Sequence, residues 1–238
     1  METVLVVGAT GNIGVAAILG ALRAKRNVLA IVRNQVSADK LFQHVRSKDG
    51  ITIVEADIMA EEGVQGVVEQ VRAGKLPTFQ HVYAAAGGAY GVTPLRDLST
   101  SELRKFMSIN FESNFLAYSA TIPYLLEQSS STSFTLCTGS QGDIGARAAP
   151  AITQGPLYSM ANVACRDNEN TNVRFNEVYL ATRVEVDSVA EKTGAMKTSD
   201  FANVYNELLS RPDIKSSRIT VATKNDLKDL KYKKKIDH

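Results

Sequence analysis

Cysteine and histidine are scarce in this sequence. The two cysteines, Cys137 and Cys165, are too few for a disulfide framework and favour a reducing environment, so we expect a cytoplasmic location. The three histidines show no spacing typical of metal ligands, so no metal cofactor is expected. No apolar stretch approaches the ~20 residues that span a bilayer. The first apolar strand starts within three residues of Met1, which leaves no room for a signal peptide.

An excess of charge of either sign is also absent. The chain has 27 basic and 25 acidic residues and a net charge of +2, which argues against a nucleic-acid partner across the whole surface. Basic residues do gather at Lys231–Lys235, and we predict a solvated tail there. Binding of nucleic acid or anionic lipid by this segment is the less favoured alternative.

Glycine is present where it carries information. The apolar run Val4–Val7 is followed by Gly8-Ala-Thr-Gly11-Asn-Ile-Gly14 and then by a helical pattern through about Lys25. Strand, glycine turn and helix in this order form a site for a dinucleotide pyrophosphate, which binds at the helix N-terminus. The alternative is a glycine turn that only joins a strand to a helix. The predicted contacts are Gly8, Thr10, Gly11, Asn12, Ile13 and Gly14.

Apolar strands alternate with helical segments along the rest of the chain. This alternation predicts an α/β fold, a single-domain Rossmann-like doubly wound parallel sheet with helices on both faces. We expect one NAD(P)-binding domain over residues 1–223 and a basic C-terminal tail over residues 224–238. A long amphipathic helical segment is predicted from Ser99 to about Gln128. Residues 141–156, rich in Gly, Ala and Pro, are predicted to form a mobile loop, with Pro156 opening the next helix.

The end of the second strand indicates which cofactor is bound. NAD-dependent dehydrogenases usually place an acid there to bind the ribose 2′-hydroxyl. This sequence has Val32-Arg33-Asn34 instead, and Arg33 can hold a 2′-phosphate by charge-assisted hydrogen bonds. We therefore predict NADP as the cofactor, with NADPH preferred over NADH. A plain surface arginine is the alternative.

With these motifs the chain resembles the short-chain dehydrogenase/reductase family over nearly its whole length, with an NmrA-like glycine motif in its first half. Asp57-Ile58 matches the pair that contacts adenine, and Ala84-Ala85-Ala86-Gly87 stands where the family has Asn-Asn-Ala-Gly. Asn110 matches the family's helix asparagine, Ser140 its active-site serine, and Tyr158-Ser-Met-Ala-Asn162 its Tyr-x-x-x-Lys motif. The resemblance thus implies cofactor contacts at Asp57, Ile58, Ala85, Ala86, Gly87, Tyr158 and Asn162.

The resemblance also implies catalytic roles. Tyr158 would exchange the proton with the substrate oxygen, Ser140 would hydrogen-bond that oxygen, and Asn110 would support a bound water. Asn162 replaces the lysine, and the lost cation costs about 1–4 kcal/mol of phenolate stabilisation. A neutral tyrosine can still donate a proton, so reduction remains feasible while alcohol oxidation becomes difficult. A second departure is Leu180-Ala181 in place of the family's Pro-Gly, which leaves the role of Thr182 open.

Three functions are compatible with these residues. The first is an NADPH-dependent reductase of a small carbonyl, iminium or conjugated alkene substrate, such as a secondary metabolite. The second is a non-redox isomerase or cyclase that uses the nucleotide pocket, and the third an NADP-sensing regulatory protein without catalysis. The expected partners are a small-molecule substrate and, through the segment at residues 99–128, a second copy in a homodimer. Neither nucleic acid nor membrane is expected.

Overall fold

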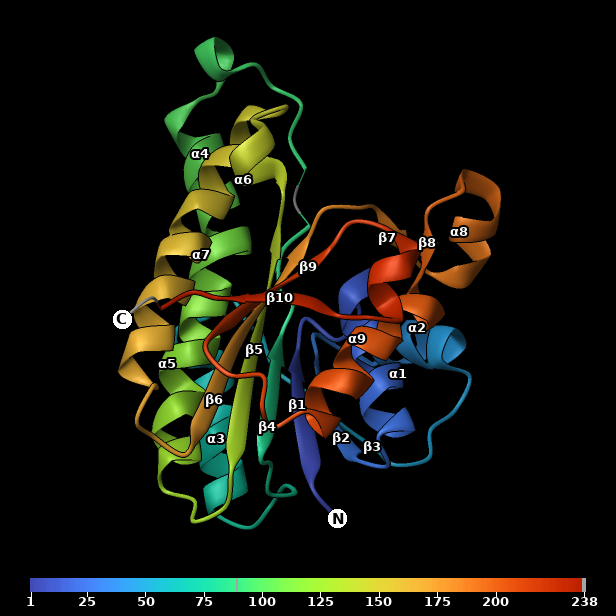
Figure 1. Ribbon diagram of the computed structural model, residues 1–238, viewed down its shortest axis with the longest axis vertical. Helices are drawn as coiled ribbons and strands as arrows, with labels where there is room; N and C mark the ends of the chain where they lie inside the picture. The colour runs from blue at the N-terminus through green and yellow to red at the C-terminus, as the bar shows by residue number, and fades with distance from the viewer. Residues whose placement is uncertain (89, 237–238) are drawn as a thin grey trace.

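The computed structural model describes residues 1–88 and 90–236, and a central sheet organises them. The described part of the sheet has eight strands in the order β10-β9-β6-β5-β4-β1-β2-β3 (Figure 1). The pairs from β3 to β9 are parallel, and β10 alone runs antiparallel to β9. The strands are β1 (Thr3–Val7), β2 (Asn27–Val32), β3 (Ile51–Glu55), β4 (His81–Ala84), β5 (Thr132–Gly139), β6 (Val173–Leu180), β9 (Ser217–Val221) and β10 (Lys231–Lys234). This order confirms the predicted Rossmann-like sheet.

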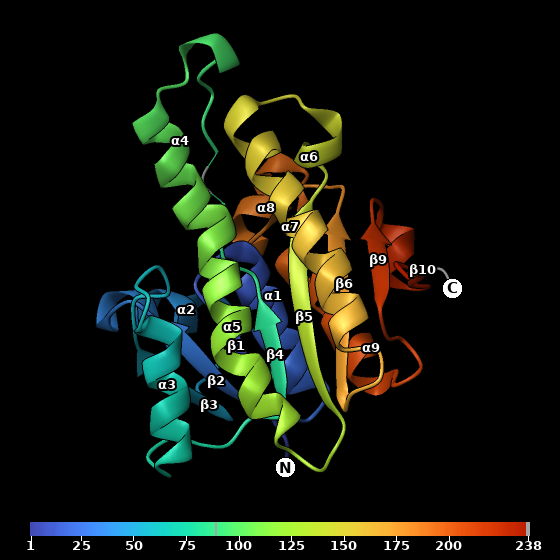
Figure 2. The same cartoon turned by 90° about the vertical axis from the view of Figure 1, so that its left-hand side faces the viewer.

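Helices cover both faces of the sheet, as predicted (Figure 2). One core packs α1 (Asn12–Arg23), α2 (Gln35–Val45) and α9 (Thr198–Ser210) against the sheet. The other core packs α3 (Gly63–Arg72), α5 (Ser113–Leu126) and α7 (Ala148–Asp167) against the opposite face. Because side chains of a strand alternate between faces, Val4 and Val6 belong to the first core and Leu5 and Val7 to the second.

The strand order reverses between β1 and β4. In open α/β sheets, ligands bind in the crevice outside the carboxyl ends of the strands at such a reversal. The glycine turn follows β1, and the segment Ala85–Gly87 follows β4, so both lie at this crevice. The fold therefore places two predicted cofactor segments side by side.

The segment predicted to be helical from Ser99 to about Gln128 is helical from Thr100 to Leu126, but it contains one wider turn. It consists of α4 (Thr100–Met107), a π-helical turn (Ser108–Glu112) and α5. Ser99 is the N-cap of α4, because its Oγ accepts a hydrogen bond from the backbone N–H of Glu102 at 3.1 Å. Asn110 lies in the π-helical turn and is buried, and such turns occur frequently at functional sites.

The prediction of a mobile loop at residues 141–156 is wrong. The structure has a short helix α6 (Gln141–Ile144), and α7 begins at Ala148, so Pro156 lies inside α7 rather than at its start. Proline removes only one backbone donor, whereas the helix buries Ala149, Pro150 and Thr153 before Pro156. This burial outweighs the loss of one hydrogen bond.

The C-terminal segment predicted to be a solvated tail is exposed at its lysines, but it is a strand rather than a tail. Residues Lys231–Lys234 form β10, whose backbone pairs with β9, while the lysine side chains remain exposed. Lys235 then turns inward to pair with the fully buried Glu177 of β6, and Ile236 packs into the core beside α7. Charged side chains on an edge strand limit pairing with other chains.

Three further short helices and a small sheet complete the described fold. They are the 3-10 helices Leu95–Asp97 and Lys224–Leu227, α8 (Asp187–Thr193), and the pair β7 (Val184–Glu185) and β8 (Met196–Lys197). Within residues 1–88 and 90–236, no helix is both long enough and apolar enough to cross a membrane.

Candidate functional site

The turn after β1 requires glycine at its first and last glycine positions, Gly8 and Gly14. Gly8 has a φ of +84°, and a Cβ there would lie 2.7 Å from the carbonyl oxygen of Ala85. A Cβ on Gly14 would lie 2.1 Å from the carbonyl oxygen of Gly8. Because neither position has room for a side chain, these two glycines set how closely β1, β4 and α1 pack.

Gly11 is different because it faces open space. It is exposed, and a Cβ there would meet only the carbonyl oxygen of Gly8, at 3.5 Å. Gly11 is the N-cap of α1 and has no side-chain cap, so the first N–H groups of a 12-residue helix point outward. A bare helix N-terminus beside an open glycine has the form that a pyrophosphate site requires.

The side chain of Asn12 is committed elsewhere. Its Nδ2 donates to the carbonyl oxygen of Val184 at 3.1 Å, which ties the start of α1 to β7. Thr198 Oγ1 donates to the carbonyl oxygen of Asn12 at 3.4 Å. The backbone N–H of Asn12 is then the part of this residue that faces a ligand, together with those of Ile13 and Gly14. Thr10 is half-buried in the same turn.

Arg33 lies at the edge where the adenosine end of a dinucleotide would bind. It is exposed directly after β2, and its side chain pairs with no acid in the described part of the chain. Asn34 caps α2, because its Oδ1 accepts a hydrogen bond from the backbone N–H of Ser37 at 3.0 Å. The first turn of α2 has no acidic residue. The surroundings of Arg33 are therefore favourable to an added phosphate.

Asp57 and Ile58 follow β3 at the same edge of the sheet. Asp57 Oδ1 accepts a hydrogen bond from the backbone N–H of Met59 at 3.0 Å, which fixes the carboxylate within its own turn. Ile58 is half-buried and packs against the core on the α3 side. Beyond the end of β3, Asp57 is thus exposed, whereas Ile58 is in part covered by the core.

The segment after β4 is tied to the helix that carries Asn110. Ala85 continues the pairing with β1 through a hydrogen bond from its N–H to the carbonyl oxygen of Val7 at 3.0 Å. Asn114 Nδ2 donates to the carbonyl oxygen of Ala86 at 3.0 Å and to that of Asn110 at 2.9 Å. Gly87, with a φ of +133°, approaches Asn110 so closely that a Cβ would lie 3.2 Å from its Oδ1.

Asn110 meets α7 at Thr153 rather than at the predicted motif. Asn110 Nδ2 donates to Thr153 Oγ1 at 3.1 Å, and Thr153 is fully buried. At about 100° per residue, Tyr158 lies about 140° around the helix from Thr153, and Asn162 about 180° around it. Asn162 is accordingly exposed. The structure therefore does not bring Tyr158 and Asn162 to the Asn110 side of α7.

Ser140 directly follows β5, at the carboxyl end of the sheet where the crevice lies. It is half-buried, and its N–H donates to the carbonyl oxygen of Leu180 at 2.9 Å. The preceding residue, Gly139, is held by α7: its N–H donates to Gln154 Oε1 at 2.7 Å, and its carbonyl oxygen accepts from the Tyr158 hydroxyl. The Tyr158 hydroxyl thus binds the carbonyl group of the residue that precedes Ser140.

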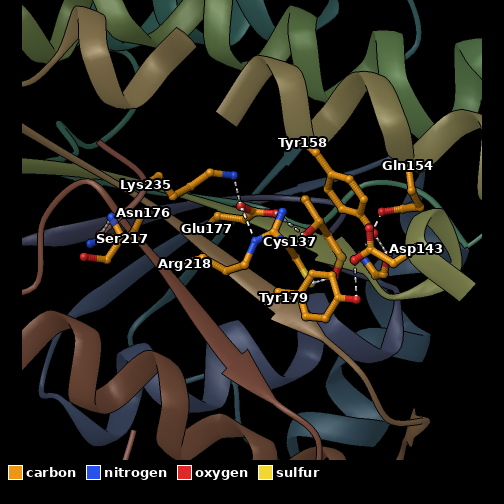
Figure 3. A network of polar contacts seen from close by, with 12 residues as sticks. Cys137, Asp143, Gln154, Tyr158, Asn176, Glu177, Tyr179, Ser217, Arg218 and Lys235 are labelled. Carbon is orange, nitrogen blue, oxygen red and sulfur yellow. Dashed lines mark hydrogen bonds and ion pairs between the residues drawn. The ribbon is translucent and has the colours of Figure 1, made fainter. Parts of the chain in front are cut away.

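Tyr158 belongs to a network of polar contacts that includes Gln154 and Arg218 (Figure 3). The guanidinium carbon of Arg218 lies 4.8 Å from the ring centre of Tyr158 and 4.7 Å from that of Tyr179. Arg218 forms two hydrogen bonds of 3.0 Å with Glu177, which also accepts from Thr138 at 2.7 Å. Tyr179 donates to Asp143 of α6 at 2.7 Å.

Burial raises the pKa of both tyrosines in this network. For Tyr158 the Asp143 carboxylate and Tyr179 raise the pKa further, and Arg218 opposes them only in part. For Tyr179, burial and the hydrogen bond to Asp143 raise the pKa to about 12. Both phenols therefore stay protonated at neutral pH.

The predicted cofactor segments converge, whereas the predicted catalytic set divides into two groups. Ser140 and Tyr158 lie together on one side of α7, and Asn110 lies with Thr153 on another. The sequence reasoning missed four residues that hold the site: Asn114, Thr153, Gln154 and Arg218. Asn114 could have been found from its spacing, because Asn110 and Asn114 are four residues apart in a helical segment. Thr153 and Gln154 were hidden by the wrong prediction of a loop there.

Comparison with known proteins gives a consistent result. The family model for short chain dehydrogenases matches residues 2–193. The short-chain dehydrogenase/reductase iacG of Pestalotiopsis fici is 54% identical over 239 residues, which cover 98% of this chain and 96% of that protein.

Solved structures share the fold at low sequence identity. A short chain dehydrogenase from Bacillus anthracis superposes with a TM-score of 0.79 at 15% identity, covering 92% of this chain and 94% of that one. A short-chain dehydrogenase/reductase of the glucose/ribitol dehydrogenase type from Brucella melitensis gives a TM-score of 0.76 at 20% identity, with coverages of 92% and 94%.

Proposed function

Because the chain belongs to the short-chain dehydrogenase/reductase family, we propose that it is an NADPH-dependent reductase of a small organic molecule. The observation that carries this proposal is the pairing of the open Gly11 turn with an unopposed Arg33 at the end of β2. The first accommodates a pyrophosphate, and the second offers a cation to the 2′-phosphate.

The residues of the turn and of the strand ends would hold the cofactor. Backbone N–H groups at the start of α1 would bind the pyrophosphate, and Asp57 with Ile58 would border the adenine. Ala85, Ala86 and Gly87 would line the crevice between β1 and β4. A bound NADPH would supply the hydride.

Ser140 would orient the acceptor group of the substrate. Its hydroxyl can donate a hydrogen bond to a carbonyl oxygen, an interaction that strengthens as negative charge develops on that oxygen. The carbonyl carbon gains the hydride and its oxygen gains one proton, from solvent or from Tyr158. Asn110 and Thr153 fix the wall of the crevice through their mutual hydrogen bond.

The substrate proposed is poorly polar. Ile144 of α6 and Ile152 of α7 are exposed, and so are Val92 and Leu95 in the segment before α4. Figure 1 shows these segments beyond the carboxyl ends of the strands, where a substrate would approach the crevice. Exposed apolar side chains near a ligand site favour apolar substrates. A carbonyl, iminium or conjugated alkene on a bulky hydrocarbon frame fits this surface.

The test is consumption of NADPH in the presence of apolar aldehydes, ketones, quinones and conjugated enones. Purified protein is mixed with each compound and with NADPH, and the loss of nicotinamide absorbance is followed. Reduced product is identified by mass spectrometry, and deuteride transfer from deuterated NADPH confirms the hydride source. The proposal is contradicted if NADPH binds tightly but no compound in a broad panel, including fungal extracts, is reduced.

A second candidate is a non-redox isomerase or cyclase with NADP as a structural ligand. It is favoured by one observation: Ala149, Thr153 and Leu157, which are buried and follow one another at four-residue spacing on the side of α7 that meets Asn110 at Thr153, include no titratable side chain. Conversion of a substrate to an isomer without change in NADPH would support this candidate. A cytoplasmic location and a homodimer through residues 99–128 remain proposals.

A further inference from the structure

Strand β5 extends past its neighbour β4. The β4–β5 pairing ends at Ala84 and Leu136, whereas the β5–β6 pairing continues to Gly139 and Leu180. In a parallel pair, alternate residues direct their N–H and C=O groups to one neighbour. Ser140 donates to Leu180, so the peptide groups of Gly139 point away from β6, where β4 no longer offers partners.

Two side chains of α7 supply the hydrogen-bond partners that β4 does not offer to Gly139. Gln154 Oε1 accepts the N–H of Gly139 at 2.7 Å, and the Tyr158 hydroxyl donates to the carbonyl oxygen of the same residue. Gln154 and Tyr158 are four residues apart, so they project from the same side of the helix. Together they pair both backbone groups of the residue that precedes Ser140.

The Tyr158 ring is also fixed in place. A Cβ on Gly142 would lie 2.6 Å from the ring, so α6 packs directly on it. Arg218 covers the ring at 4.8 Å, and two hydrogen bonds to the fully buried Glu177 anchor Arg218. A ring held by α6 and Arg218 cannot turn about 140° around α7 toward the Asn110 side.

We propose that Tyr158 is a positioning residue, which with Gln154 holds the Gly139 peptide and thereby places the Ser140 hydroxyl, and that it is not the proton donor. The inference rests on the proposed function for the role of Ser140. The proton that the substrate oxygen gains then comes from water at the open end of the crevice.

Amide hydrogen exchange tests the positioning role without any substrate. Tyr158→Phe removes one anchor of Gly139 and Gln154→Leu removes the other. Each variant should speed exchange at Gly139 and Ser140 roughly fivefold, the effect of one lost hydrogen bond. Tyr179→Phe is the matched control, since Tyr179 also flanks Arg218 but donates to Asp143, and it should leave exchange at Gly139 unchanged. Unchanged exchange in Tyr158→Phe overturns the proposal.

Kinetics provide the second readout once a substrate is known. A positioning role predicts that Tyr158→Phe and Gln154→Leu both lower kcat several-fold, with KM and the shape of the pH profile retained. A proton donor predicts a loss of about 10²–10⁴ in Tyr158→Phe alone, with a changed pH profile, and that result overturns the proposal. If no compound is ever reduced, the proposed function fails, and the exchange measurement still decides whether Tyr158 and Gln154 hold Gly139.

Discussion

Asn110 donates a hydrogen bond to Thr153 across 3.1 Å, and this contact defines which side of α7 faces the crevice. Gly87, which follows β4, lies close to Asn110. Asn110 therefore links Thr153 to the crevice at the end of β4. Tyr158 and Asn162 project from other sides of the same helix. Tyr158 and Asn162 have the spacing of the family motif. They do not lie on the side of α7 that contacts Asn110, the asparagine that matches the family's.

Arg33→Ala should weaken NADPH binding by about 1.5–3 kcal/mol, because a charged hydrogen bond to the 2′-phosphate is lost. NADH lacks this phosphate, so its affinity should hardly change. Titration of bound-nicotinamide fluorescence measures both affinities. Arg104→Ala, which removes an exposed arginine from the last turn of α4, is the control and should affect neither cofactor. Equal losses for NADPH and NADH in Arg33→Ala would contradict the assignment.

Gly11→Val should abolish the binding of both cofactors while the protein stays folded. The position has a φ of −78° and open space around its Cβ, so a side chain fits the protein but blocks the approach of the phosphates. Gly14→Ala should instead destabilise the protein, since its Cβ would lie 2.1 Å from the carbonyl oxygen of Gly8. Circular dichroism melting and cofactor titration separate the two effects. Unaltered affinity in Gly11→Val would place the phosphates elsewhere.

The sequence allowed the fold to be predicted well where local pattern and tertiary role agree. Buried strands such as Val4–Val7 and the glycine turn are local signals, and both are confirmed. The region from Gln141 to Pro156 was mispredicted because Gly and Pro suggest a loop, whereas burial of Ala149 and Thr153 decides in favour of helix. Motif spacing alone placed Tyr158 with Asn110. Their separation depends on how α7 is rotated about its own axis, which no local sequence pattern predicts.

The C-terminal strand shows the same limit. A run of lysines indicates a solvated segment, yet Lys235 pairs with Glu177, 58 residues away in sequence. Glu177 is fully buried in β6, and its two cationic partners come from β9 and from the residue after β10. Such a buried pair can be recognised only when the topology is known.

Glu177→Gln should destabilise the protein by about 3–5 kcal/mol, because Arg218 and Lys235 would lose their shared carboxylate in a buried setting. Urea unfolding monitored by circular dichroism measures the change. Glu127→Gln is the matched control, since Glu127 pairs with Arg72 at 2.6 Å on the surface and its loss should change stability little. Similar losses of stability in the two variants would show that burial of Glu177 does not strengthen the effect of its ion pairs.

Asp226→Asn should reduce stability at neutral pH by about 1–3 kcal/mol. The backbone N–H groups of Thr223 and Ala222, with Lys231, hold the pKa of Asp226 well below its usual range. A depressed carboxylate pKa stabilises the fold fully above the unfolded value of about 4. This contribution decreases as the pH falls below that value and is gone only below the folded-state pKa. The difference between wild type and Asp226→Asn should therefore shrink from about pH 5 to pH 3 in urea unfolding. Asp229→Asn, an exposed change three residues on, is the control and should leave stability at neutral pH nearly unchanged.

Asn162→Lys tests whether the lost lysine limits catalysis. If Asn162 stood beside the reacting groups, a lysine there would lower the pKa of Tyr158 and speed the oxidative direction. The side chain is exposed and lies about 180° around α7 from Thr153, so we expect less than about a twofold change in kcat in either direction. Thr153→Lys is the informative partner variant, because it places the charge beside Asn110. Both variants are assayed on one substrate in both directions across a pH series, with folding checked by circular dichroism. A large gain in alcohol oxidation by Asn162→Lys alone would show that α7 turns when the cofactor binds, bringing Tyr158 and Asn162 into the crevice after all.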